Sequence, residues 1–159
     1  MQSFKIIKPI HILTPYVRYY WILEDGADVS VSERTLPTGC IQLVFHRGKR
    51  LLLVGKKESQ PQAFICGQCL NFSDVMSAGK IEMITVVFQP YAARAILQLP
   101  LKFFYGELIA VDAIEDLELS ILSRKVIEAD DHETCIRLIE QFLIHRLYSC
   151  LLYTSDAAD

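Results

Sequence analysis

The sequence predicts an α+β fold that is mainly β, in which an antiparallel β-barrel or sandwich is followed by two or three C-terminal helices. About seven or eight short segments rich in β-branched and aromatic residues recur every 8 to 12 residues or so before Phe88, which is typical of such folds. After Gly106 the apolar residues recur at helical spacing instead. The chain has 159 residues, 52% of them hydrophobic, so we expect one domain with a closed core.

The first convincing strand is predicted over Tyr16 to Glu24. Alternation places one set of its side chains on the core-facing side: Val17, Tyr19, Trp21 and Leu23. Asp25-Gly26 predicts a turn, and Val29 to Leu36 predicts a more polar strand suited to a sheet edge. A second turn at Pro37-Thr38-Gly39 then precedes another strand.

That next strand, Cys40 to His46, has two different faces. Ile41, Leu43 and Phe45 form an apolar face that we expect in the core. The opposite face mixes polar and apolar side chains, Cys40, Gln42, Val44 and His46, which suits the lining of a small-molecule pocket with aromatic help from the first strand. The candidate ligand-binding residues are Tyr20, Trp21, Cys40, Gln42 and His46. Strand parity alone leaves open which face is hollow.

A basic run follows at His46-Arg47-Gly48-Lys49-Arg50. A phosphate site is one interpretation. The favoured alternative is the tip of a hairpin that joins Ile41–Phe45 to Leu51–Val54, because such tips normally carry solvated charges. Two more short strands are expected over Ala63 to Cys66 and Phe72 to Met76.

The stretch from Ile81 to Leu108 changes from strand to helix. Ile81 to Phe88 is dense in β-branched and aromatic residues and predicts a buried strand. Pro90 ends that strand and suits the first turn of a short helix over residues 90–99, which Pro100 closes. We therefore expect Phe88 and Ile96 to be buried where the strand passes into the helix.

Two longer helices are predicted after this junction. The first runs from Asp112 to about Ile127, with an apolar stripe of Ile114, Leu117, Ile121 and Leu122. A capping pair, Asp130 and Glu133, predicts the start of the second, which runs to about Leu147. The last residues, 149–159, fit neither pattern, and Leu151 to Asp159 resembles translated adapter sequence found at the broken ends of metagenomic reads. We expect this tail to be non-native.

Composition and motifs exclude several classes of function. The five cysteines are an odd number, and Cys66-Gly-Gln-Cys69 lacks a second pair, so reduced structural thiols are favoured over a metal or redox pair. The net charge of -3 gives no overall attraction to nucleic acid. Phosphate loops, zinc-protease motifs and nucleophile elbows do not occur, and the four histidines lack ligand spacing. We expect no catalytic residues, no metal, no cofactor, no membrane contact and a cytoplasmic location.

Several strings carry a family resemblance: YVRYYW, LPTGCIQLVFHRG, FICGQ and above all VVFQPYAARAILQLPLKFF. Over roughly Pro9 to Leu147 the chain resembles the regulatory domain that precedes the helix-turn-helix module in AraC-type bacterial transcriptional regulators. The family often has Gly-Gly or Gly-Ala after the proline, where this chain has Tyr91-Ala92. The resemblance implies a cupin-like β-barrel over residues 1–110 and a helical dimerisation segment over residues 111–148 of the same domain.

The resemblance also implies a partner set and a missing part. The chain would bind a small-molecule effector, form a homodimer and contact DNA only through a C-terminal module outside this sequence. No DNA-binding residue is therefore expected here. The leading hypothesis is the sensor and dimerisation domain of such a regulator. The alternatives are a free-standing cupin-like small-molecule-binding protein or isomerase, and an interaction domain without ligand.

Overall fold

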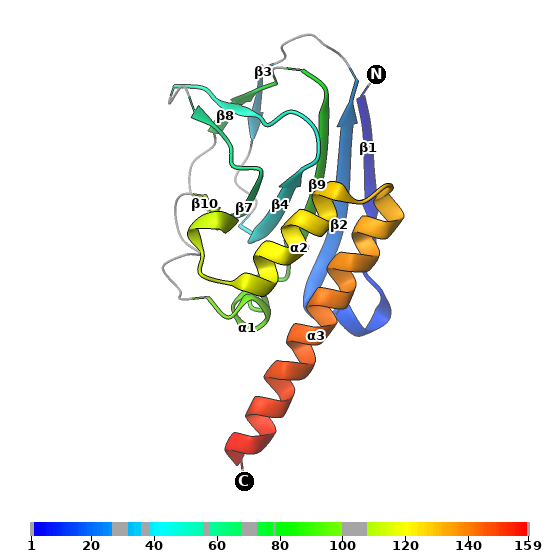
Figure 1. The fold of residues 1–159 in the computed structure, drawn as a ribbon, viewed down its shortest axis with the longest axis vertical. Helices are drawn as coiled ribbons and strands as arrows, with labels where there is room; N and C mark the ends of the chain where they lie inside the picture. Colours follow the sequence, from blue (N-terminus) through cyan, green and yellow to red (C-terminus); the bar gives the residue numbers. More distant parts are fainter. Residues whose placement is uncertain are drawn as a thin grey trace.

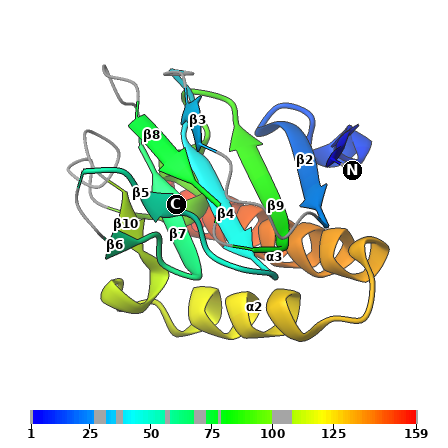
Figure 2. The same cartoon turned by 90° about the horizontal axis from the view of Figure 1, so that it is seen from above.

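The computed structural model describes residues 2–26, 32–35, 39–55, 58–67, 73–77, 79–99 and 108–158. Its elements form three layers, a small sheet, a large sheet and a pair of helices (Figures 1 and 2). Pro37 and Thr38 of the second predicted turn, residues 101–106 and the second cysteine of the Cys66-Cys69 pair lie outside the described residues.

Both sheets are antiparallel. The larger has six strands in the order β1 (Gln2–Ile7), β2 (Val17–Asp25), β9 (Ile81–Phe88), β4 (Gln42–His46), β7 (Ala63–Cys66) and β10 (Ile109–Ala110). The smaller has four strands in the order β3 (Ser32–Thr35), β8 (Ser73–Met76), β5 (Leu52–Leu53) and β6 (Glu58–Ser59). The described strands do not close into a barrel, so the mainly β, α+β prediction is confirmed in its sandwich form.

The helices follow the strands, as predicted. A 3₁₀ turn, His11–Leu13, lies between β1 and β2, and a short helix α1 (Ala93–Leu97) follows β9. A second 3₁₀ turn, Val111–Ala113, is followed by α2 (Leu117–Glu128) and α3 (His132–Ala158). Figure 2 shows α2 and α3 along one side of the large sheet. Each face of that sheet has its own apolar cluster, one shared with the helices and one shared with the small sheet. In the described part of the chain, no helix is long and apolar enough to cross a bilayer.

The predicted faces of the first strand are right at Val17 and wrong beyond it. Register shifts between Val17 and Tyr19 where β2 pairs with β9, so a bulge reverses the alternation beyond it. Val17, Tyr20 and Ile22 therefore face the helices and are at most 4% exposed, whereas Trp21 and Leu23 pack on the opposite face. One extra residue sends each later side chain to the other side of the sheet.

The strand-to-helix junction has the predicted core. Phe88 is 0% exposed and Ile96 is 1% exposed, and both belong to the cluster between the large sheet and the helices. The helix is shorter than the predicted 90–99, because Pro90 to Ala92 form a turn and Gln98, with a left-handed φ of 54°, ends it.

Three further boundaries and one pairing differ from the prediction. Asp116 caps α2 through the Leu119 amide at 3.1 Å, and Asp131, one residue after the predicted cap, accepts from the Thr134 amide at 2.7 Å. Helix α3 continues past Leu147 to Ala158. The predicted hairpin of Ile41–Phe45 with Leu51–Val54 does not form, since β4 pairs with β7 and β9 while β5 belongs to the other sheet.

Candidate functional site

The face of β4 that looks towards the small sheet carries a fully buried histidine. His46 is 0% exposed, and its Nε2 lies 2.8 Å from Oε1 of Gln60. An amide oxygen can only accept, so Nε2 carries the hydrogen and Nδ1 is an acceptor. Burial lowers the pKa of His46, although the hydrogen bond that His46 donates to Gln60 works in the other direction. The imidazole is therefore neutral near pH 7.

Two polar atoms on this face have no hydrogen-bond partner among the described residues, Nδ1 of His46 and Oγ1 of Thr85. Thr85 lies directly opposite Val44 in the β4–β9 pair, and both His46 and Thr85 are 0% exposed. Their surroundings are apolar: Val44, Phe64 and Met83 form the cluster here, and the His46 and Phe64 rings are 5.8 Å apart. Buried polar groups normally have partners, so the pair marks a place suited to a neutral hydrogen-bonding group.

The structure separates the predicted ligand-binding residues. By alternation Gln42, His46 and Trp21 share the face towards the small sheet, with Gln42 and Trp21 half-buried and His46 fully buried. Tyr20 lies on the opposite face, where its hydroxyl is 3.1 Å from Oε2 of Glu140, and burial raises its pKa. Cys40 is buried, and its Sγ accepts from Arg18 at 3.3 Å.

Among the described residues, the cavity found between the sheets is small. A cavity of about 30 Å³ lies at the edge of this layer, between Leu23, Leu51, Val75 and Ile81. That volume holds one or two water molecules, so an organic ligand would need the two sheets to move apart.

A second polar site lies where the helices meet the large sheet, and Arg47 is at its centre. Its guanidinium donates to Oε1 of Glu82 at 2.6 Å, to the carbonyl of Ala129 at 2.7 Å and to the carbonyl of Val126. It also lies 3.0 Å from Sγ of Cys135, whose pKa is raised by burial. The side chain is only 8% exposed, so the predicted solvated charge is wrong for this residue of the basic run.

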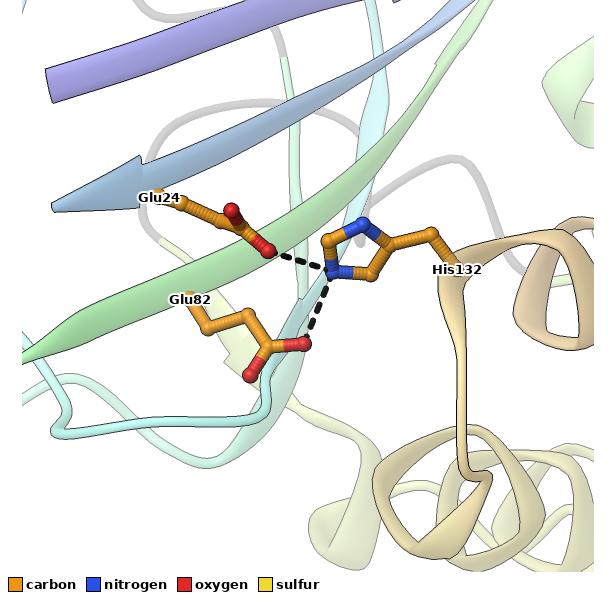
Figure 3. Close-up of side chains that lie close together, drawn as sticks. All are labelled: Glu24, Glu82 and His132. Carbon is orange, nitrogen blue, oxygen red and sulfur yellow. Dashed lines mark hydrogen bonds and ion pairs between the residues drawn. The ribbon is translucent and has the colours of Figure 1, made fainter.

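Two carboxylates and a histidine complete this site (Figure 3). Glu24 and Glu82 are directly opposite each other on β2 and β9, and Nε2 of His132 lies 3.0 Å from the first and 2.8 Å from the second. Partial burial works against ionisation, yet hydrogen bonds from Arg47 and His132 hold the pKa of Glu82 below its ordinary value. We call this set of residues the Arg47 network: Glu24, Arg47, Glu82, His132 and Cys135.

A metal ion is one occupant that these groups suggest, because ligand atoms of Glu24, Glu82 and His132 lie within 4.8 Å of one another. However, the Glu82 oxygen that faces His132 also accepts from Arg47 at 2.6 Å. A guanidinium this close repels a cation and already satisfies that oxygen. The geometry favours an ion-pair network that fixes the start of α3 over a metal centre.

Sequence reasoning missed this network. The four histidines lack ligand spacing, so His132 was not a candidate, yet its side chain is 29% exposed and contacts both carboxylates. The one available signal was the glutamate that interrupts each of two otherwise apolar strands near one end, at Glu24 and Glu82. Their partners are far away in sequence, so spacing did not reveal them.

Comparison with known families gives one match. A family described as "Domain of unknown function (DUF6597)" matches residues 5–110. This region contains the second half of β1, the other nine described strands and α1, and the chain belongs to this family. No curated protein matches the chain.

Proposed function

We propose that this chain is the effector-sensing and dimerisation domain of an AraC-type transcriptional regulator, with DNA binding in a helix-turn-helix module outside this sequence. The observation that carries the proposal is the string VVFQPYAARAILQLPLKFF, which starts at Val86. Five of its residues belong to the core at the β9–α1 junction: Phe88, Ala93, Ile96, Leu97 and Leu99. The resemblance therefore rests on residues that specify packing of this junction.

The sensing part of the proposal is supported by the layer between the two sheets. His46 and Thr85 each have an unpartnered polar atom there among the described residues, within an apolar surround. Most small-molecule sites combine apolar walls with a few polar groups. The small sheet consists of strands of two to four residues, and moving it away from β4 and β9 would open room for an effector. A neutral molecule with a hydroxyl or amide group fits these two atoms best.

Sequencing the DNA downstream of the Tyr148 codon tests the regulator assignment. We expect a continuous reading frame that encodes a pair of helix-turn-helix motifs over about 100 further residues. A chain extended by that frame should bind promoter fragments specifically at physiological salt, and the 159-residue chain should not, since it is net acidic. Specific binding by the short chain, or a stop codon soon after Tyr148, would contradict the assignment. The stop codon would favour the free-standing small-molecule-binding alternative.

The sensing claim needs a separate experiment. Thermal shifts should be measured for the chain against a panel of neutral hydroxyl- and amide-bearing compounds, with matched carboxylates as the control panel. A neutral ligand that stabilises the wild-type chain should stabilise His46→Leu much less, because Nδ1 is lost. Arg50→Leu, at a neighbouring exposed position, should keep the full shift. Equal shifts in the His46 variant, or binding of carboxylates alone, would contradict this site.

A further inference from the structure

Strand β1 forms an open edge of the large sheet. It pairs with β2 in register over all six residues, Gln2 to Ile7, and none of the described strands pairs with its other side. Phe4 and Ile6 on this strand are each 58% exposed. Natural sheets usually protect such an edge with a proline, a bulge or several charges, and β1 has only Lys5. A long apolar edge of this kind is suited to pairing with another strand.

A groove runs beside this edge on the helix side of the sheet. It has a volume of about 770 Å³ and lies between β1 and α3. Ile7, Ile10, Ile136 and Ile144 give it apolar walls. Its charged side chains are of both signs: Lys5, Glu133, Arg137 and Glu140. A strand added to β1 would lie about 5 Å beyond it, so every second side chain of the added strand would point over this groove.

A second copy of β1 fits both the edge and the groove. In an antiparallel pair, opposite residues point to the same face of the sheet. The incoming strand therefore presents Ser3, Lys5 and Ile7 on the groove side and Phe4 and Ile6 on the other side. On that other side the ring of Phe4 already lies 5.8 Å from Trp21, so the new contacts would be apolar.

Charge selects the register. Two-fold pairing centred on Phe4 or on Lys5 joins five residues of each β1, whereas centring on Ser3 or Ile6 joins only three. Of the two longer registers, the one centred on Lys5 places like charges opposite each other, and the one centred on Phe4 places Lys5 opposite Ser3. Ser3 is paired with Glu24, which contacts His132 at the start of α3. In the Phe4-centred register we therefore expect the incoming lysine near the start of α3, where Glu133 lines the groove, so that each copy can both give and receive an ion pair.

We propose that two copies of this chain associate through antiparallel β1 strands, with Phe4 opposite Phe4, so that the two large sheets become one continuous sheet. The inference deepens the dimerisation part of the proposed function and moves the interface from the helices alone to the sheet edge. The groove between β1 and α3 of each copy then receives the Lys5 and Ile7 side chains of the other copy.

The oligomeric state of purified variants tests this pairing. Sedimentation velocity and light scattering over about 1 to 100 μM should show a dimer for the wild-type chain and a dissociation constant at least about tenfold weaker for Ile6→Lys. Leu117→Lys is the matched control, because Leu117 is 73% exposed at the start of α2, which follows β10 at the opposite edge of the large sheet from β1. Circular dichroism should show the same fold for all three. A monomeric wild type, or an Ile6→Lys dimer as tight as the control, would overturn the proposal.

A charge exchange tests the register. Lys5→Glu and Glu133→Lys should each weaken self-association, since each places like charges across the interface. An equimolar mixture of the two should form heterodimers as tight as the wild-type dimer, because both ion pairs are restored between copies. A mixture that associates no better than the separate variants would refute the Phe4-centred register.

These outcomes are independent of the regulator assignment. A chain that dimerises through β1 but has no downstream helix-turn-helix frame would keep this inference and remove the proposed function. A monomeric chain with such a frame downstream would do the reverse.

Discussion

Replacing Arg47 with methionine tests whether the Arg47 network holds the helices on the sheet. Methionine keeps most of the side chain's length and apolar surface but removes every donor. The substitution takes away the ion pair to Glu82 and the hydrogen bonds to the carbonyls of Val126 and Ala129. These carbonyls lie at the end of α2 and in the loop that follows it, so they have no helical partners of their own.

The expected cost follows from burial. Removing one partner of a buried ion pair typically costs about 3 to 5 kcal/mol, because the other charge remains uncompensated. Here Glu82 is 29% exposed and keeps its contact with His132, so water and the imidazole offset part of the loss. The two carbonyls add roughly 1 to 3 kcal/mol for each one that water does not reach. We expect a loss of about 3 kcal/mol, a large share of the stability of an ordinary domain.

Urea unfolding followed by circular dichroism measures this loss. Arg47→Met should lower the midpoint with an unchanged slope. Arg50→Met is the control from the same turn; Arg50 is exposed, and its substitution should change the free energy by no more than about 0.5 kcal/mol. A loss below about 1 kcal/mol for Arg47→Met, or equal losses for both variants, would refute the argument that this guanidinium fixes the helices.

Three more outcomes follow from the same contacts. Stability should fall as the pH drops below about 6.5, because the unfolded chain protonates His46 before the folded chain does. It should fall again below about 4.5, where the unfolded chain protonates Glu82 first. Urea midpoints from pH 8 to 4 measure both steps, and His46→Leu should remove the step at the higher pH. Phe88→Ala should cost about 3 to 5 kcal/mol, and an unchanged midpoint would contradict the burial argument. Gly48→Ala should cost roughly 1 to 3 kcal/mol, since its Cβ would lie 2.7 Å from the Lys80 carbonyl, whereas Gly26→Ala meets nothing within 4 Å and should be close to neutral.

Local patterns were sufficient to predict the class of fold. The density of β-branched residues over Ile81 to Phe88 and the proline after it located β9 and the start of α1 to within a few residues. The faces of β2 were not predictable in this way, because the bulge after Val17 depends on how β2 meets β9, more than 60 residues away in sequence. The pairing of β4 was missed for the same reason, since its partners are the more distant strands β7 and β9 and not the segment that follows it directly.

The polar sites differ in the same way: one was predictable from local sequence and the other was not. His46 was a candidate because alternation put it on the mixed face of one strand, and that information is local. The network of Arg47, Glu82 and His132 joins residues separated by 35 and 50 positions, and no spacing rule connects them. The basic run around Arg47 looked like a solvated turn because the carbonyls that bury its guanidinium belong to the helix pair.

The position of the Arg47 network explains why two glutamates are tolerated side by side. Glu24 and Glu82 lie on the helix-facing side of the large sheet, next to the core pair Ile22 and Ile84, where like charges would normally destabilise the strands. Arg47 from the end of β4 and His132 from the start of α3 bring positive and hydrogen-bonding groups to them only when the helices are docked. The same contact fixes the start of α3, and so the width of the groove beside β1. Arg47→Met should therefore weaken self-association of the folded chain as well as its stability, and sedimentation under native conditions would detect that second effect independently of unfolding.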